Sequence, residues 1–447
     1  MNLDTLLRTA RADHDFRALV RSSGLLYVAG IFSYGLTFLQ QITTANLIGL
    51  NAYGQFATVV AATGLVMLIA DFRTWEAASK FLAVPLATKD YQQASRIVGW
   101  LSAFDVVSGA IGASAVLLLS PLLAQYLLHD EATQVLIALY SFSLPFRLFA
   151  AGVPNAFLRL ENRFGWLAAK SIVFSVARLI LISGPAFMGL GLPGVLVGAL
   201  AADAFHACVM AWLTFKLWHD LQVEQPVRRR LTLARPAELG RILDMLRTLW
   251  IGASLKALQL ETFIPILALL TSPAQVGLLR FGLDVAQMVM RLSEPFSIVI
   301  QPTLIQLGET GDRKRFLRYI ALAFCGLLLI AVPFFAGVVT LGPSILPLFI
   351  DPVYIPAIPV IQVLALGFAV SAAMLWLRPA IIALDCVRQQ NTVGLFTLIV
   401  SVVSLILVAP AYGAIGAAVV MTGFLLFYNL LSSGIVIRHF SRNSVTV

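Results

Sequence analysis

Long apolar runs separated by short polar breaks cover most of the chain. A run of roughly 18 or more apolar residues can cross the hydrocarbon core of a bilayer as a helix. Gly, Pro, Asn or charged residues bound the runs. About twelve spans are predicted, at residues 24–48, 53–72, 97–120, 134–157, 166–188, 193–217, 247–271, 276–303, 318–342, 355–384, 391–409 and 413–437. The pattern therefore predicts an all-α integral membrane protein.

Composition agrees with this class. Of the 447 residues, 59% are hydrophobic and 12% are charged, whereas a soluble globular domain has about 25% charged residues. A soluble enzyme, a disordered chain and a fibrous protein are excluded. The three cysteines lie inside apolar runs without metal-ligand spacing, so no metal site and no disulfide framework are expected.

The net charge of +9 is distributed on one side of the predicted membrane. Lys and Arg are absent from the loops 48–53, 120–133, 188–193, 271–276, 342–355 and 409–413. The positive-inside rule then places the basic loops and both termini in the cytoplasm. The basic run at 228–230 is explained as a topology determinant near anionic lipid headgroups, and nucleic acid is not an expected partner. The first 22 residues form either an amphipathic helix on the membrane surface or a solvated basic tail.

A polar stretch at 218–246 divides the spans six and six. Tyr53-Gly54 precedes Val276-Gly277 by 223 residues, and Asp71-Phe72 precedes Glu294-Pro295 by the same offset. Two parallel six-helix bundles are predicted, at 1–217 and 247–447, joined by a cytoplasmic basic linker at 218–246. Parallel repeats of this kind occur in many transporters.

Many charged residues fall inside the predicted spans. A charge at the centre of a bilayer costs roughly 2.5–3.5 kcal/mol on insertion scales, so these side chains must face a wet cavity or one another. They are Asp105, Arg147, Arg178, Asp203, Lys256, Glu261, Arg280, Asp284, Arg291 and Glu294, with Arg378 and Asp385 in the cytoplasmic half of span 355–384.

Span 276–303 carries the clearest polar stripe. Spacings of 4, 3, 4 and 3 place Arg280, Asp284, Gln287, Arg291 and Glu294 on one face of a helix. Two compatible interpretations follow. The stripe lines a cavity, or it is an ion-pair ladder of Arg280 with Asp284 and Arg291 with Glu294.

Three other basic residues lie near the middle of their spans. Lys256, Arg147 and Arg178 either face a cavity or reach the interface with their long side chains. At spacing three, Asp203 and His206 share a helix face. They could carry a proton, but a satisfied internal hydrogen bond between them is favoured.

Asp71 and Arg73 stand at the inner end of span 53–72, within the segment Asp71-Phe-Arg-Thr-Trp-Glu76. They are interpreted either as interfacial anchors or as a polar patch at a cytoplasmic entrance. The sequence does not decide between the two.

The segment 46–57 (NLIGLNAYGQFA), followed by an apolar span and DFRTWE at 71–76, resembles the start of polysaccharide-transporter (O-antigen flippase) proteins. These belong to the multidrug/oligosaccharidyl-lipid/polysaccharide exporter superfamily. The likeness extends to RLENR at 159–163 and GLPG at 191–194. It implies a V-shaped pair of six-helix bundles around a central cavity, alternating access, and transfer of an undecaprenyl-diphosphate-linked oligosaccharide from the cytoplasmic to the periplasmic leaflet for O-antigen-like or exopolysaccharide biosynthesis.

Depth and helical face assign candidate roles. A diphosphate head needs a positive path through the membrane, and Arg suits bidentate phosphate contact. The expected phosphate-binding residues are Lys256, Arg291, Arg280, Arg147, Arg178, Arg73 and Arg378. The expected ion-coupling or ion-pair residues are Asp284, Glu294, Glu261, Asp203, Asp105 and Asp71. No catalytic residue, metal or cofactor is expected, and a proton or a sodium ion is the candidate coupling ion.

Two alternatives remain open. A multidrug exporter of the same superfamily would carry organic cations and favour an acidic cavity, but five basic and five acidic residues in the predicted spans 3–8 do not decide this. A membrane-embedded polymerase or ligase would need a large outward loop, which the chain lacks. The expected setting is a monomer in the bacterial inner membrane, with membrane lipids, a polysaccharide polymerase and a chain-length regulator as candidate partners.

Overall fold

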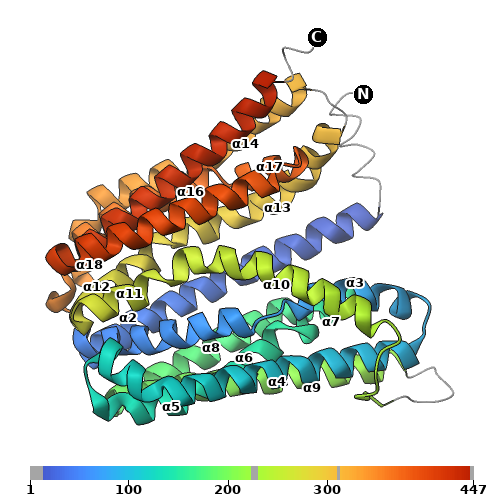
Figure 1. The fold of residues 1–447 in the computed structure, drawn as a ribbon, viewed down its shortest axis with the longest axis horizontal. Coiled ribbons are helices and arrows are strands. Elements are labelled where there is room, and N and C mark those ends of the chain that lie inside the picture. The colour runs from blue at the N-terminus through green and yellow to red at the C-terminus, as the bar shows by residue number, and fades with distance from the viewer. Residues whose placement is uncertain (1–13, 223–229, 310–312, 443–447) are drawn as a thin grey trace. The chain divides into compact units, whose positions relative to one another are not determined.

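The computed structural model describes residues 14–222, 230–309 and 313–442, and these contain helices and no strand. Figure 1 shows the helices. They are α2 (His14–Ala70), α3 (Thr74–Ala87), α4 (Tyr91–Leu123), α5 (Gln134–Ser141), α6 (Ser143–Ala151), α7 (Val153–Leu160), α8 (Phe164–Phe187), α9 (Gly191–Asp220), α10 (Leu239–Glu261), α11 (Phe263–Leu270), α12 (Pro273–Ala286), α13 (Met288–Glu309), α14 (Arg313–Thr340), α15 (Gly342–Ile345), α16 (Ala357–Ala373), α17 (Leu377–Ala383) and α18 (Val387–Arg442). Single short turns of other helix types are η1 (Ala124–Leu128), η2 (Glu131–Thr133), η3 (Leu346–Leu348) and η4 (Pro352–Tyr354).

Eight helical segments of the described chain are long and apolar enough to cross a membrane. Two of them, Leu26–Ala70 and Val387–His439, are 45 and 53 residues long, more than twice the roughly 20 residues that one crossing needs. Each contains a glycine with a non-helical backbone, Gly49 (φ 80°, ψ 165°) and Gly413 (φ 54°, ψ −134°). These conformations suit glycine, which has no Cβ. Both glycines fall in loops that the hydropathy pattern predicts, at 48–53 and 409–413.

The chain separates into two compact units. Unit 1 comprises the residues up to Gln40, Val66–Ser120 and Val135–Ala253; unit 2 comprises Gln41–Leu65, Pro121–Gln134 and the residues from Ser254 onward. Helix α2 therefore contributes to both units. The predicted domain limits at residues 217 and 247 stay a prediction.

Unit 1 packs around one apolar core. Helix α8 lies along α9, α6 and α7 pack on α9, and α3 packs on α7. Fully buried core residues include Leu82, Leu101, Phe157 and Met210. Helix α3 was not predicted, because its 14 residues are too few for a membrane span. It buries Ala77, Ala78, Phe81 and Leu82, whereas Lys80, Ala83 and Val84 are exposed.

Unit 2 is organised around α16. This helix packs against α12, α14 and α18, and α13 packs against α14 and α17. Its fully buried large side chains include Phe263, Phe281, Phe316 and Tyr354.

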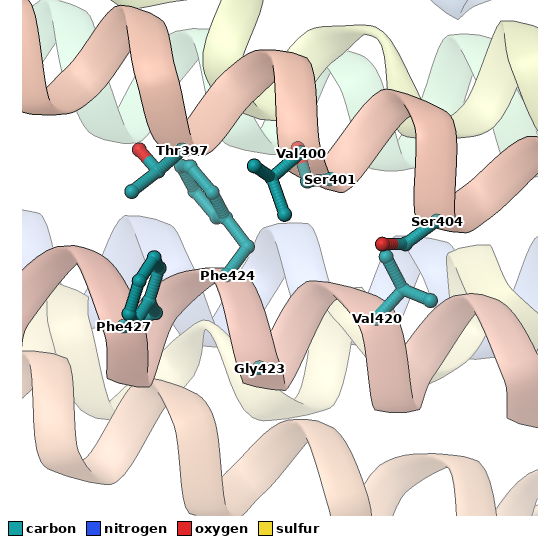
Figure 2. A pocket seen from close by; sticks show the side chains of 8 residues that line it. All are labelled: Thr397, Val400, Ser401, Ser404, Val420, Gly423, Phe424 and Phe427. Atoms are coloured by element: carbon teal, nitrogen blue, oxygen red, sulfur yellow. The ribbon is translucent and has the colours of Figure 1, made fainter.

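Between the two halves of α18 lies a groove of about 270 Å³ (Figure 2). Its lining residues are Thr397, Val400, Ser401, Ser404, Val420, Gly423, Phe424 and Phe427. The hydroxyls of Thr397 and Ser401 donate to backbone carbonyls of their own helix. The lining contains no charged side chain, so the groove is not our candidate site for a charged substrate.

Candidate functional site

Three basic side chains enter the interior of unit 1, and two of them lie near one carboxylate. Arg147 is on α6, and Lys170 and Arg178 are on α8. Both arginines lie within electrostatic range of Asp203 on α9, and Asp203 is only 8% exposed. We call Arg147, Lys170, Arg178 and Asp203 the basic cluster. Lys170 joins it through His206 of α9, on which both Lys170 and Arg178 act electrostatically. Its formal charge is positive, since it contains three cationic groups and one carboxylate.

Donors of the basic cluster remain available. Nη1 of Arg147 and Nε of Arg178 are buried and have no hydrogen-bond partner among the described residues. Lys170 donates to Oδ1 of Asn155 over 3.3 Å. A buried polar group without a partner costs free energy, so these guanidinium nitrogens favour an anion or water beside them.

His206 lies next to this cluster in an unexpected orientation. Its ring stacks on Phe174, with centroids 4.1 Å apart and planes 19° apart, and the Arg178 guanidinium lies 5.8 Å from the centroid of Phe174. Nε2 of His206 is buried without a hydrogen-bond partner in the described part of the chain. The favoured internal hydrogen bond between Asp203 and His206 is therefore wrong, because the aromatic ring of α8 sets the orientation of the imidazole.

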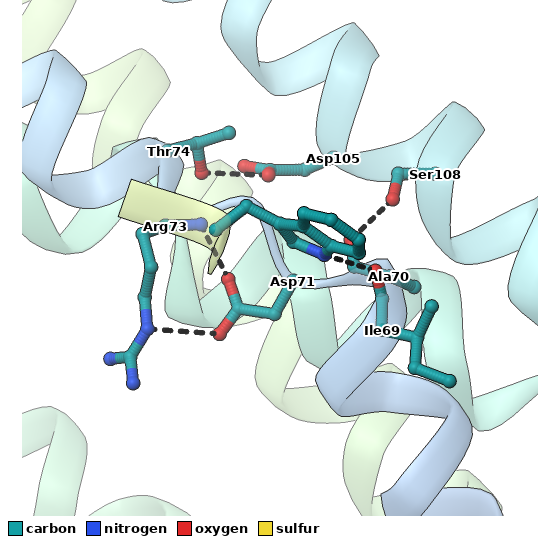
Figure 3. Close-up of polar contacts among 8 residues, drawn as sticks. Ile69, Ala70, Asp71, Arg73, Thr74, Asp105 and Ser108 are labelled. Atoms are coloured by element: carbon teal, nitrogen blue, oxygen red, sulfur yellow. Dashed lines mark hydrogen bonds and ion pairs between the residues drawn. The ribbon is translucent and has the colours of Figure 1, made fainter. Parts of the chain in front are cut away.

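A second group of polar side chains lies at the C-terminal end of α2 in unit 1 (Figure 3). Trp250 Nε1 donates to the carbonyl of Ile69 over 2.7 Å, and the Ser108 hydroxyl donates to the carbonyl of Ala70. The last carbonyls of a helix lack partners within the helix. Here side chains from α10 and α4 donate these missing hydrogen bonds, so both helices are hydrogen-bonded to the C-terminal end of α2.

The turn between α2 and α3 holds the two residues predicted at the inner end of the span. Asp71 Oδ1 accepts from the backbone N–H of Arg73 at 2.8 Å, and Asp71 Oδ2 is 3.9 Å from Arg73 Nε. Arg73 has a left-handed backbone (φ 56°). Their side chains are 33% (Arg73) and 30% (Asp71) exposed. This contact is local, within one turn, and about a third of each side chain remains accessible.

Asp105 of α4 lies behind this turn, with 5% of its surface exposed. Its Oδ1 accepts a hydrogen bond from the Thr74 hydroxyl over 2.7 Å (Figure 3). Its Oδ2 is buried and has no hydrogen-bond partner among the described residues. Gly152, at the break between α6 and α7, lies against this oxygen. A Cβ at position 152 would clash with it and would come within 2.8 Å of Thr74 Oγ1.

In unit 2, Asp284 accepts hydrogen bonds from two helices. Arg280 Nη2 lies 3.1 Å from its Oδ1, and Arg280 Nε and the Tyr53 hydroxyl donate to Oδ2 over 3.2 and 2.9 Å. The predicted ion pair of Arg280 and Asp284 is confirmed. The Asp284 side chain is 3% exposed, whereas about a third (32%) of the Arg280 side chain is exposed.

Residues near the kink at Gly49 fix a loop of unit 2. The Asn46 amide donates to the carbonyl of Phe349 over 2.7 Å and accepts from the backbone N–H of Asp351 at 3.0 Å. The Tyr354 hydroxyl donates to the carbonyl of Ala45. Burial, with a contribution from Asp351, raises the pKa of Tyr354 above its usual value. Tyr354 therefore stays a neutral donor at physiological pH.

The structure explains much of the segment that carries the family resemblance. Asn46 holds the 349–351 loop and Tyr53 bonds Asp284. Gly54 packs directly on the backbone of Pro273 and Gly277. These contacts were not predicted from the sequence, since their partners lie more than 200 residues away.

Of the other predicted site residues, Glu261 lies within electrostatic range of Arg280. The side chains of Lys256 and Glu294 lie outside the described residues, so their predicted roles stay predictions. Arg291 on α13 is half-buried and engaged in interactions. Glu261, at the end of α10, and Arg378, on α17, are exposed.

Long apolar helices and buried charges together define a multi-pass membrane protein, and its fold is that of transporters. The model of a family described as "Polysaccharide biosynthesis protein" matches residues 19–308. The chain belongs to this family, and the predicted resemblance is confirmed.

Solved structures share the fold at low sequence identity. An inward-facing multidrug resistance MATE family transporter of the MOP superfamily matches with a TM-score of 0.75 and 13% identity, over 95% of this chain and 100% of that one. The lipid II flippase MurJ, in an inward closed conformation, matches with a TM-score of 0.73 and 15% identity, over 94% and 90%.

One curated relative is an inner membrane protein, YghQ of Escherichia coli (strain K12). It is 26% identical over 159 residues, which are 36% of this chain and 44% of that protein. The match thus spans less than half of the relative's length.

Proposed function

We propose that this protein is a flippase for lipid-linked oligosaccharides, which moves an undecaprenyl-diphosphate-linked glycan from the cytoplasmic to the periplasmic leaflet by alternating access. Family membership supports a role in polysaccharide biosynthesis. Likeness to the lipid II flippase MurJ supports a fold suited to such cargo. In this proposal the chain crosses the bacterial inner membrane about twelve times, with both termini in the cytoplasm.

The single observation that carries the proposal is the basic cluster. Its two arginines lie within electrostatic range of one carboxylate, Lys170 lies near His206 beside them, and two buried arginine nitrogens lack partners among the described residues. A diphosphate supplies the oxygens that such donors need, and a low dielectric strengthens the attraction. In unit 2, Arg280 is a further cationic group, paired with Asp284 and with about a third of its side chain exposed.

The basic cluster also favours this cargo over an organic cation. The five basic and five acidic residues of the predicted spans 3–8 balance, but within unit 1 the charges that the structure brings together are predominantly positive. A positive site repels an organic cation. The alternative function, a multidrug exporter, is therefore one of the outcomes that the test below distinguishes. The coupling ion is proposed separately.

The test is transport of a fluorescent lipid-diphosphate oligosaccharide in sealed vesicles that contain the purified protein. We expect Arg147→Gln and Arg178→Gln each to reduce the transport rate, at equal protein level, because each removes a phosphate donor. Lys216→Gln is the matched control. Lys216 lies on α9 but packs over Trp166 and Trp212, outside the basic cluster, so we expect it to leave the rate unchanged.

Two results would refute the proposal. One is a wild-type protein that moves no lipid diphosphate while it moves organic cations. The other is a full transport rate in the double variant Arg147→Gln with Arg178→Gln.

A further inference from the structure

Three aspartates are buried in the part of the chain that the structure describes: Asp105, Asp203 and Asp284, at 5%, 8% and 5% exposure. Two have cationic neighbours. Asp284 pairs with Arg280 at 3.1 Å, and Asp203 is in electrostatic range of Arg147 and Arg178. Asp105 has no ion pair within 4 Å among the described residues. It is the exception in this set.

The side chains around Asp105 are neutral or negative. From α3, Thr74 donates one hydrogen bond to it. At the α6–α7 break the backbone N–H of Val153 lies near the carboxyl, and Gly152 borders the oxygen that has no hydrogen bond within 3.5 Å among the described residues. The charged residue that acts on it is Asp71 of the α2–α3 turn, which has the same sign. Arg73, the nearest cation of that turn, contacts Asp71 instead. An ionised carboxylate here would be a buried charge without a counterion, which costs several kcal/mol.

We propose that Asp105 is a proton-binding site, and that uptake and release of this proton couple a proton gradient to transport. In the conformation of this structure the carboxyl is neutral and carries its proton. Release breaks the O–H bond, transfers the proton to water and leaves a carboxylate. The claim that this proton is coupled to transport (the coupling half) rests on the proposed function. The claim that Asp105 binds a proton does not.

The position of Asp105 explains how one proton could move helices. Its carboxyl contacts the start of α3 through Thr74 and the α6–α7 break at Gly152. One turn further along α4, Ser108 holds the last carbonyl of α2. A carboxylate would favour a conformation in which Asp105 reaches water or a cation. Such a conformation must rearrange at least one of these three helix ends.

Proton binding is tested by infrared spectroscopy of the purified protein in lipid, at neutral pH without sodium. We expect a carbonyl band from a protonated carboxyl that disappears in Asp105→Asn, a nearly isosteric change. Asp284→Asn is the matched control, since a carboxylate paired with Arg280 contributes no such band. A band that persists in Asp105→Asn, or that sodium ions abolish at constant pH, would overturn the proposal, and the sodium result would make Asp105 a metal-cation site.

A second variant keeps the test decisive if Asp105→Asn does not fold. Thr74→Val removes the hydrogen bond to Asp105 while keeping the side-chain size. We expect the band to remain and to shift to higher frequency. An unshifted band would show that the protonated group is not Asp105.

Coupling is tested in sealed vesicles with a fluorescent lipid-diphosphate oligosaccharide. We expect a pH gradient to accelerate the wild type and to have no effect on Asp105→Asn. Equal acceleration of both would overturn the coupling half. A wild type that transports no such lipid would refute the proposed function, and the infrared result would then stand alone.

Discussion

The hydroxyl of Tyr53 donates a 2.9 Å hydrogen bond to Oδ2 of Asp284, across 231 residues of sequence. Both groups are buried, and Arg280 completes the contact from the same helix as Asp284. Tyr53 also meets the ring of Tyr354 edge-on, at a centroid distance of 6.3 Å. A residue of the first predicted half thus satisfies a buried charge of unit 2.

Our first prediction separates the two donors to Asp284. Tyr53→Phe removes one hydrogen bond to a charged acceptor, so we expect a loss of about 1.5–3 kcal/mol in stability. Arg280→Ala leaves a buried carboxylate without its counterion, and we expect a loss of about 3–5 kcal/mol. Thermal unfolding in detergent measures both. If the pair is structural, the double variant Arg280→Ala with Asp284→Ala is more stable than Arg280→Ala alone; equal stability would contradict this.

The second prediction concerns a close backbone approach of α2. A Cβ at Gly54 would lie 2.6 Å from the carbonyl carbon of Pro273 and 3.0 Å from the amide nitrogen of Gly277. Backbone atoms cannot rotate away, so we expect Gly54→Ala to cost at least about 1–3 kcal/mol and to lower the yield of folded protein. Gly64→Ala, in the same helix, is the control. A Cβ at Gly64 would meet no atom within 4 Å, and alanine favours a helix by about 0.5–1 kcal/mol. Equal losses in both variants would refute the packing explanation.

The sequence was sufficient for the long apolar helices and for one ion pair within a helix. Apolar runs mark the membrane segments, and spacing four correctly pairs Arg280 with Asp284, because residues i and i+4 are neighbours on a helix. Contacts between different helices could not be predicted from the sequence. The hydrogen bond between Tyr53 and Asp284 could not be predicted. The predicted hydrogen bond between Asp203 and His206 was wrong, because the imidazole ring stacks on Phe174 of another helix. Helical periodicity tells which face a residue occupies but not what that face meets.

The same limit applies to the buried aspartates. Asp105 and Asp203 look alike in sequence, since each is a carboxylate inside an apolar run. What distinguishes them is the set of cations that tertiary packing brings near. Only the folded chain shows that Arg147 and Arg178 approach Asp203, and that Asp105 is approached by a threonine and a glycine.

The third prediction tests the orientation in the membrane. Single cysteines at Asn51, Leu190 and Val353 should react with a membrane-impermeant maleimide added to intact cells. Cysteines at Gln92 and Arg235 should react only after the membrane is opened. All five positions are exposed in the structure. The expectation follows from the absence of Lys and Arg on the side of the first three.

This labelling requires a background without accessible thiols. Cys208 and Cys325 are exposed, so both are first replaced by serine, whereas the buried Cys386 can stay. A cysteine at Arg235 that labels in intact cells would reverse the assignment of the cytoplasmic side.

The last prediction is a pH dependence at the turn between α7 and α8. Burial raises the pKa of the Glu161 carboxyl, and the neighbouring Arg163 guanidinium offsets part of this rise. The unfolded value is about 4.3, so the folded chain binds this proton more tightly than the unfolded one. The resulting stabilisation of the folded chain is complete below about pH 4. It is lost as the pH rises through the pKa of Glu161 in the folded chain.

Glu161→Gln removes this pH dependence. We therefore expect its melting temperature, relative to wild type, to rise as the pH increases from about 4 through the folded pKa of Glu161, and then to stay constant. The gain should remain below about 1 kcal/mol, because the side chain is only partly buried. Arg163→Gln should instead steepen the pH dependence, and a wild type and Glu161→Gln with parallel profiles would contradict the assignment.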